Sequence, residues 1–208
     1  MIVENKICDR NFTYLEPWFY NNNLAMRCEL GIGDTDEEYM QNAEQRAMEI
    51  FDILFANGID AIFYDFYEQD FLKDGEANQE PYTRNFPIYV KKQLEFTRVL
   101  FNKYRHLVLK DLKTNDDFDD IHRHRIICYM DNKKLNHNKY IHLNVFGHEN
   151  RISFVSFENE CIYSIYDDRG CDIVFFTKEK FIEFYEKLQP YFLNYDVAIM
   201  KDRYFALL

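Results

Sequence analysis

The sequence predicts an α+β fold with a mixed, largely antiparallel sheet and two or three flanking helices. The first observation is a strand–turn–strand pattern over residues 161–176, in which side chains alternate before the turn and a β-branched and aromatic run follows it. The second is a strongly periodic helix pattern between Thr35 and Gly58. The third is a series of short strand-like runs in the second half of the chain, which favours antiparallel neighbours.

The hairpin has a polar tip and leads into a helix. Asp168 and Gly170 supply the turn, because an aspartate bonds its own backbone and a glycine tolerates positive φ. Thr177 then predicts the N-cap of a helix. The apolar stripe of that helix is formed by Phe181, Phe184, Tyr185 and Leu188.

The first half of the chain predicts strand, helix and strand. Residues 24–30 alternate, so that Arg27 and Glu29 share the face opposite the apolar one. Thr35 and Glu38 form a capping box, and the helix they open carries apolar residues at steps of three and four. Gly58 ends this helix, and residues 59–67 predict a further strand.

The other predicted elements complete a single domain over residues 1–208, with an N-terminal arm at about 1–20. Residues 12–20 predict a short helix broken at Pro17 or an extended arm. A helix is expected from Phe86, with Pro87 in its first turn. Further strands are expected over residues 106–110, 125–130, 140–146 and 152–158. Residues 191–208 are aromatic and should pack back on the core.

The charge and aromatic content of the chain favour some classes of function over others. The 208-residue chain has a formal net charge of −11, which disfavours binding to nucleic acid or to an anionic membrane. Its 20 Phe and 16 Tyr suit a well-packed core and also provide interface anchors. No glycine-rich phosphate loop or nucleophile elbow is present, so we expect no cofactor.

The five cysteines predict reduced, mostly buried thiols. Their number is odd and no two have the C-x-x-C spacing of a metal or redox site. The N-terminus lacks the basic and apolar regions of a signal peptide, and no apolar run approaches the roughly eighteen residues of a membrane helix. We therefore expect a cytoplasmic protein; the sequence gives no oligomeric state.

Residues 116–124 are the most metal-like stretch. His122 and His124 are two residues apart, so on a strand they would point the same way, and Asp119 or Asp120 could complete a site. Arg123 and Arg125 place two cations beside them, however, and charge compensation between an acidic loop and a basic strand explains the pattern more simply. The segment fits no EF-hand loop.

A second polar set is the candidate binding site. It consists of Arg27, Glu29, Asp167, Asp168 and Arg169. In one interpretation, Arg27 pairs with a carboxylate at a sheet edge and Asp168 only makes the turn. In the other, the set forms part of a recognition surface.

Three stretches together resemble a known family. They are Trp18-Phe19-Tyr20-Asn21-Asn22 leading into Met26-Arg27-Cys28-Glu29-Leu30-Gly31, then Arg46-Ala47-Met48-Glu49-Ile50-Phe51, and then Tyr166-Asp167-Asp168-Arg169-Gly170-Cys171-Asp172-Ile173. The chain resembles, from Trp18 to Tyr204, an uncharacterised family of Gram-positive bacterial proteins, domain of unknown function 3885. The resemblance implies a bacterial cytosolic protein and transfers no catalytic residue.

Taken together, these patterns favour binding over catalysis. We expect a protein-binding module of the immunity or antitoxin type, whose acidic surface speeds its encounter with a basic protein and whose aromatic residues then hold that partner. The alternative is a metal-dependent hydrolase that uses residues 116–124.

Overall fold

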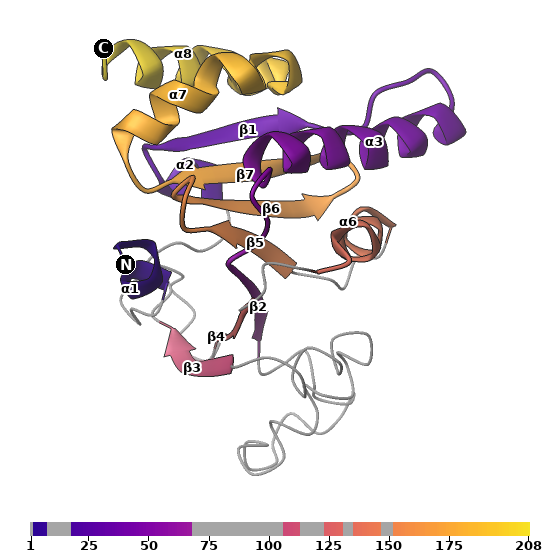
Figure 1. Ribbon diagram of the computed structural model, residues 1–208. Coiled ribbons are helices and arrows are strands. Elements are labelled where there is room, and N and C mark those ends of the chain that lie inside the picture. Colours follow the sequence, from indigo (N-terminus) through magenta and orange to yellow (C-terminus); the bar gives the residue numbers. More distant parts are fainter. Residues whose placement is uncertain (1, 8–17, 68–105, 113–122, 131–134, 147–151) are drawn as a thin grey trace, which may run out of the picture.

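A computed structural model describes residues 2–7, 18–67, 106–112, 123–130, 135–146 and 152–208 (Figure 1). The helices are α1 (Ile2–Ile7), α2 (Trp18–Asn21), α3 (Asp36–Leu54), α6 (His137–Phe146), α7 (Lys178–Leu188) and α8 (Val197–Phe205), with 3-10 turns η2 (Gln189–Tyr191) and η3 (Asn194–Asp196). The strands are β1 (Ala25–Glu29), β2 (Ala61–Tyr67), β3 (His106–Leu112), β4 (Arg123–Tyr129), β5 (Ile152–Ser156), β6 (Cys161–Asp167) and β7 (Gly170–Phe175).

The seven strands form one open sheet in the order β1-β7-β6-β5-β2-β4-β3, and every described pair is antiparallel. The predicted α+β class and antiparallel sheet are therefore confirmed. The predicted hairpin is β6–β7, and β1 lies beside it at one edge. In the register of β1 and β7, Arg27 stands opposite Asp172, and Glu29 stands opposite Gly170.

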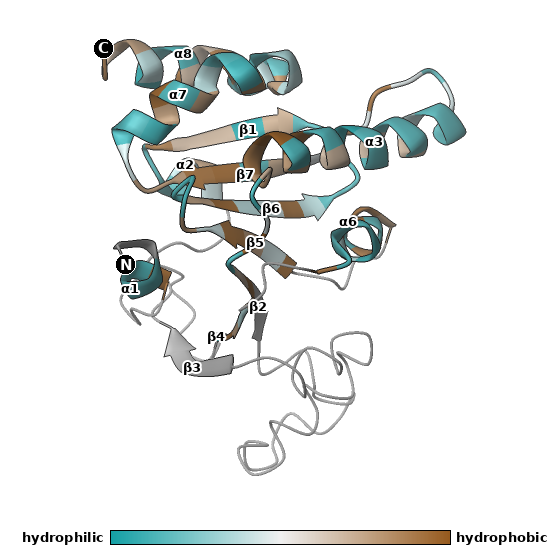
Figure 2. Cartoon of the chain, viewed as in Figure 1, coloured by the Kyte–Doolittle hydropathy of each residue, from teal (hydrophilic) through white to brown (hydrophobic). Residues whose placement is uncertain are grey.

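One face of the sheet packs against α3, α6 and α7. The Tyr163 hydroxyl donates to the Ala47 carbonyl of α3 at 3.0 Å, the Phe51 ring meets Phe154 edge-on, and Phe184 of α7 stacks on Phe175. In Figure 2, β5 and β7 are largely brown, whereas α3 and α7 carry teal stretches beside brown ones, as amphipathic helices do. Among the described helices, none combines the length and apolar character that a membrane crossing requires.

The predicted return of the C-terminal segment onto the core is also confirmed, and this segment covers the free edge of β1. Arg203 of α8 donates to the Ala25 carbonyl at 3.0 Å, and the Leu193 N–H donates to the Arg27 carbonyl at 3.1 Å. Arg46 of α3 donates to the Glu29 carbonyl at 2.9 Å. The outward carbonyls of β1 are thus occupied, which protects an edge that would otherwise invite strand pairing.

The predicted N-cap residues, Thr35 and Thr177, do precede helices α3 and α7. The Thr35 hydroxyl accepts from the Glu38 N–H at 3.2 Å, as the capping box predicts, although the Glu38 carboxylate accepts from the Asp34 N–H. Thr177 does occupy the N-cap of α7, but its hydroxyl donates to Glu160 and makes no capping bond. The Thr177 hydroxyl thus bonds the Glu160 side chain and leaves the first N–H groups of α7 without a side-chain cap.

Two sequence predictions are wrong. Residues 140–146, expected as a strand, belong to α6, where burial of Tyr140, Ile141, Asn144 and Val145 has the spacing of a helix. Gly170 does not use positive φ; it lies in β7 beneath the Tyr166 hydroxyl. The predicted helix from Phe86 lies outside the described residues.

The described cysteines, Cys28, Cys128, Cys161 and Cys171, are free and buried, as predicted. Burial raises the pKa of the Cys128 thiol from 9.0 to about 12, and burial also raises the pKa of Cys161. A raised pKa favours the folded state below the unfolded pKa, and this contribution is lost as the pH rises toward the folded value.

We therefore predict alkaline destabilisation that begins near pH 9. At pH 10, each strongly buried thiol should have lost about 1.4 kcal/mol of its contribution to the free energy of unfolding. Urea unfolding at pH 8 and pH 10 measures this loss, and Cys161→Ala should make the fall shallower. Equal urea midpoints for the unmodified protein at the two pH values would contradict the prediction.

Candidate functional site

The site begins with alternation along an edge strand. On β1, Met26 and Cys28 point into the core, whereas Arg27 and Glu29 share the opposite face. Because β7 pairs with β1 in register, Asp172 lies directly across from Arg27. Two residues far apart in the sequence thereby meet on one face of the sheet.

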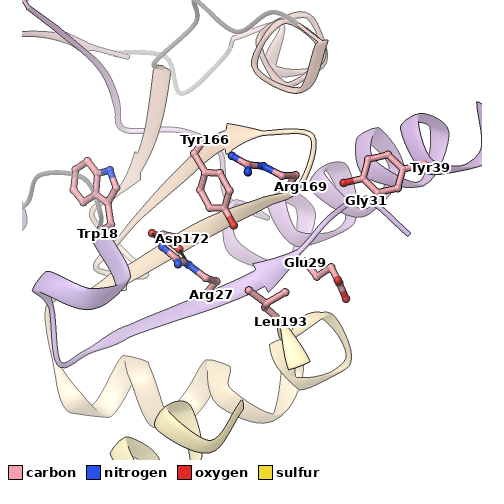
Figure 3. A pocket seen from close by; sticks show the side chains of 9 residues that line it. All are labelled: Trp18, Arg27, Glu29, Gly31, Tyr39, Tyr166, Arg169, Asp172 and Leu193. Carbon is pink, nitrogen blue, oxygen red and sulfur yellow. Dashed lines mark hydrogen bonds and ion pairs between the residues drawn. The ribbon is translucent and has the colours of Figure 1, made fainter. Parts of the chain in front are cut away.

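Arg27 and Asp172 form a bidentate ion pair (Figure 3). The Arg27 Nε lies 2.7 Å from Asp172 Oδ1, and Nη2 lies 2.9 Å from Oδ2. The Phe19 N–H of α2 also donates to Oδ2, at 3.0 Å. Asp172 is only 1% exposed, so these bonds replace the water that its carboxylate has lost.

The electrostatics of the pair follow from its burial. Burial disfavours the charged guanidinium, but the hydrogen bonds and charge of Asp172 outweigh this effect and raise the pKa of Arg27. Burial raises the pKa of Asp172, against the opposing effects of Arg27 and the Phe19 N–H. Arg27 stays charged, and its charge and hydrogen bonds favour the charged form of the buried Asp172 carboxylate.

Aromatic rings surround the Arg27 guanidinium. Its central carbon lies 4.8 Å from the Tyr20 ring centroid, 5.2 Å from that of Phe19 and 5.4 Å from that of Tyr166. A second buried carboxylate, Asp196, accepts from the Tyr20 hydroxyl at 3.2 Å and lies 3.8 Å from Arg27 Nη1. Arg27 thus joins β1 to α2, β6, β7 and the start of α8.

A cavity of about 640 Å³ opens beside this pair. Its lining residues are Trp18, Arg27, Glu29, Gly31, Tyr39, Tyr166, Arg169, Asp172 and Leu193. Figure 3 shows Trp18 at one end, Tyr39 with Gly31 at the other, and the ion pair between them. We call this cavity the β1 pocket.

Two glycines allow the tyrosines to lie close to the backbone. A Cβ atom at Gly31 would collide with the Tyr39 ring, and one at Gly170 would collide with the Tyr166 hydroxyl. Because Gly170 has no side chain, the Tyr166 hydroxyl can lie directly over its backbone, close to the Cys28 carbonyl of β1. The glycines therefore shape the walls of the β1 pocket.

Charges at the Tyr39 end of the β1 pocket are mostly acidic. Arg169 donates to both oxygens of Asp167 through its backbone N–H and guanidinium, so this cation is already neutralised. Burial raises the pKa of Tyr39, and the nearby charges of Asp168 and Asp167 add to the rise. Neither Glu29 nor Asp168 makes an ion pair among the described residues.

The structure brings the five predicted binding residues to one region. Arg27, Glu29 and Arg169 line the β1 pocket, while Asp167 and Asp168 stand beside them at the hairpin tip. Sequence reasoning missed the other lining residues, which are Trp18, Gly31, Tyr39, Tyr166, Asp172 and Leu193. Asp172 carried a signal, since it is a lone carboxylate inside an apolar strand.

The predicted metal site falls mostly on residues that the structure does not describe. Asp119 and His122 lie outside the described residues, and so does most of the segment 116–124. His124 is in β4, where its backbone pairs with Phe66 of β2. Within the described ranges, no group of three or more metal-ligating side chains comes together.

We predict that Arg27→Ala destabilises the protein by about 3–5 kcal/mol, because it leaves the Asp172 carboxylate buried and uncompensated. Arg169→Ala is the matched control; it removes an arginine whose side chain is 73% exposed and should change stability by no more than about 0.5 kcal/mol. Chemical denaturation of both variants measures the difference. Similar losses in the two variants would show that Asp172 does not depend on Arg27.

Comparison with known proteins places the chain in a family without defining an activity. The search of curated proteins and the search of solved structures each gave no significant match. A family model described as "Domain of unknown function (DUF3885)" matches residues 5–196. This range includes every lining residue of the β1 pocket. The chain therefore belongs to the DUF3885 family.

Proposed function

We propose that this protein is a protein-binding module whose β1 pocket accepts a basic side chain of a partner. It would act as immunity proteins and antitoxins do, by occupying a basic protein without performing chemistry on it. The pocket is built from paired charges and aromatic rings, which suit recognition.

The observation that carries this proposal is the negative charge of Glu29, which the described ion pairs of the β1 pocket do not neutralise. Asp172 neutralises Arg27, and Asp167 neutralises Arg169. Glu29 lines the same cavity and makes no ion pair within the described ranges, and Asp168 is close enough for its charge to act on Tyr39 at one end of the cavity. A cation entering the pocket would supply the missing partner of Glu29.

The size and the walls of the β1 pocket support the same ligand. A cavity of about 640 Å³ has room for the long stem of a lysine or arginine. Tyr39 and Tyr166 line it, and a cation that reaches the Tyr39 ring would gain about 0.5–2 kcal/mol, whereas the Tyr166 ring already lies beside Arg27. The Leu193 side chain provides an apolar contact for the methylene groups of the stem.

The overall charge supports rapid association with such a partner. A formal net charge of −11 attracts a basic protein over distances beyond direct contact. Salt screens this attraction, so the association rate constant should fall as ionic strength rises. An association rate that stays constant from low to high salt would contradict this electrostatic part of the proposal.

The test uses fluorescent hexapeptides that carry lysine, arginine or glutamate in a neutral background, with binding followed by fluorescence anisotropy. We expect the basic peptides to bind and the acidic ones not to bind. Glu29→Gln should weaken binding about tenfold, because it removes a charge-assisted hydrogen bond.

The control variant is Glu179→Gln, which removes the same charge from the exposed first turn of α7, away from the β1 pocket. It should bind basic peptides nearly as well as the unmodified protein. Equal weakening by the two variants would mean that net charge, and not the β1 pocket, attracts the peptides. Absence of binding to every basic peptide would refute the proposal.

A further inference from the structure

A patch of exposed apolar residues adjoins the β1 pocket on the side of the C-terminal segment. It consists of Tyr20, Tyr195 and Ile199, which are 50%, 85% and 39% exposed. We call it the tyrosine ridge. Tyr195 lies in η3, and Ile199 follows it by four residues, which is about one helical turn.

Tyr20 is held rigidly although half of it is exposed. Its hydroxyl donates to the buried Asp196, its ring meets Phe19 edge-on at 5.1 Å, and the Arg27 guanidinium lies over it at 4.8 Å. A fixed aromatic side chain loses little conformational entropy when a partner binds it. Tyr20 is therefore a preorganised anchor, and not a loose surface ring.

The tyrosine ridge is continuous with the β1 pocket. Leu193 lines the pocket and bonds to the Arg27 backbone, and Tyr195 follows two residues later. Asp196, next in the chain, holds the Tyr20 hydroxyl. On the other side, Arg27 touches both the Tyr20 ring and the Tyr166 ring of the pocket wall.

The mode of contact is constrained by the edge of β1. Its outward carbonyls at Ala25, Arg27 and Glu29 already accept bonds from Arg203, Leu193 and Arg46. A partner therefore cannot add a strand there without breaking these bonds. Contact must come through side chains, with a charged group at one end and an apolar group at the other.

We propose that the tyrosine ridge extends the β1 pocket, and that the partner presents a basic residue flanked by a large apolar residue. This inference rests on the proposed function, since Glu29 selects the basic residue. The charge complementarity at Glu29 and Asp168 identifies the partner as a basic protein, and the ridge defines the apolar side chain that must accompany the cation.

The test compares two fluorescent peptides, one with lysine or arginine next to tryptophan and one with serine in place of the tryptophan. The unmodified protein should bind the tryptophan peptide about tenfold more tightly. Tyr195→Ala should abolish this preference and leave binding of the serine peptide unchanged. Thermal unfolding confirms that the variant is folded.

Phe205→Ala is the matched control, because Phe205 is an exposed aromatic residue, 68% exposed, at the far end of α8. It should retain the preference for tryptophan. If Tyr195→Ala also retains the preference while Glu29→Gln still weakens both peptides, the ridge is not part of the site and the proposed function stands. If Tyr195→Ala and Phe205→Ala reduce the preference for tryptophan equally, the proposed role of the tyrosine ridge is also wrong. If neither peptide binds the unmodified protein, both proposals fail.

Discussion

The described structure depends on the ion pair that Arg27 makes with the buried carboxylate of Asp172. Asp172 lies in an apolar strand and is 1% exposed, so its charge is tolerated only because Arg27 and the Phe19 N–H bond to it. These two partners come from different elements, β1 and α2. The hydrogen bonds to this one carboxylate therefore hold β1 and α2 in place. Through Tyr20 and Asp196 they also hold the beginning of α8.

This arrangement separates structural charges from available ones. A buried ion pair contributes little net stability compared with apolar packing, but removing one partner is costly, and so the pair specifies one arrangement of its surroundings. Arg27 and Asp172 thereby hold Tyr20 and Tyr166 in place. Glu29, only two residues along β1, makes no ion pair with the residues that the structure describes. Rigid aromatic walls beside the Glu29 carboxylate are the basis of the binding function that we propose.

Sequence patterns predicted the parts of the fold that depend on local signals. The β6–β7 hairpin and the long helix α3 follow from alternation, helical periodicity and capping at Thr35. The same reasoning wrongly predicted a strand at residues 140–146, because a short alternating run with β-branched residues can also be buried as a helix. The β1 pocket was only half predictable: Arg27 and Glu29 stand out on their strand, whereas Tyr39 and Asp172 join them through register and packing, which a sequence does not display.

A double-mutant cycle tests the central claim, that Arg27 and Asp172 act as one unit. The cycle compares Arg27→Met, Asp172→Asn and the double variant by equilibrium denaturation. We predict a coupling free energy of about 2 kcal/mol or more, with the double variant more stable than the sum of the single losses implies. A coupling below about 0.5 kcal/mol would mean that the two side chains are stabilised independently, and would contradict the account.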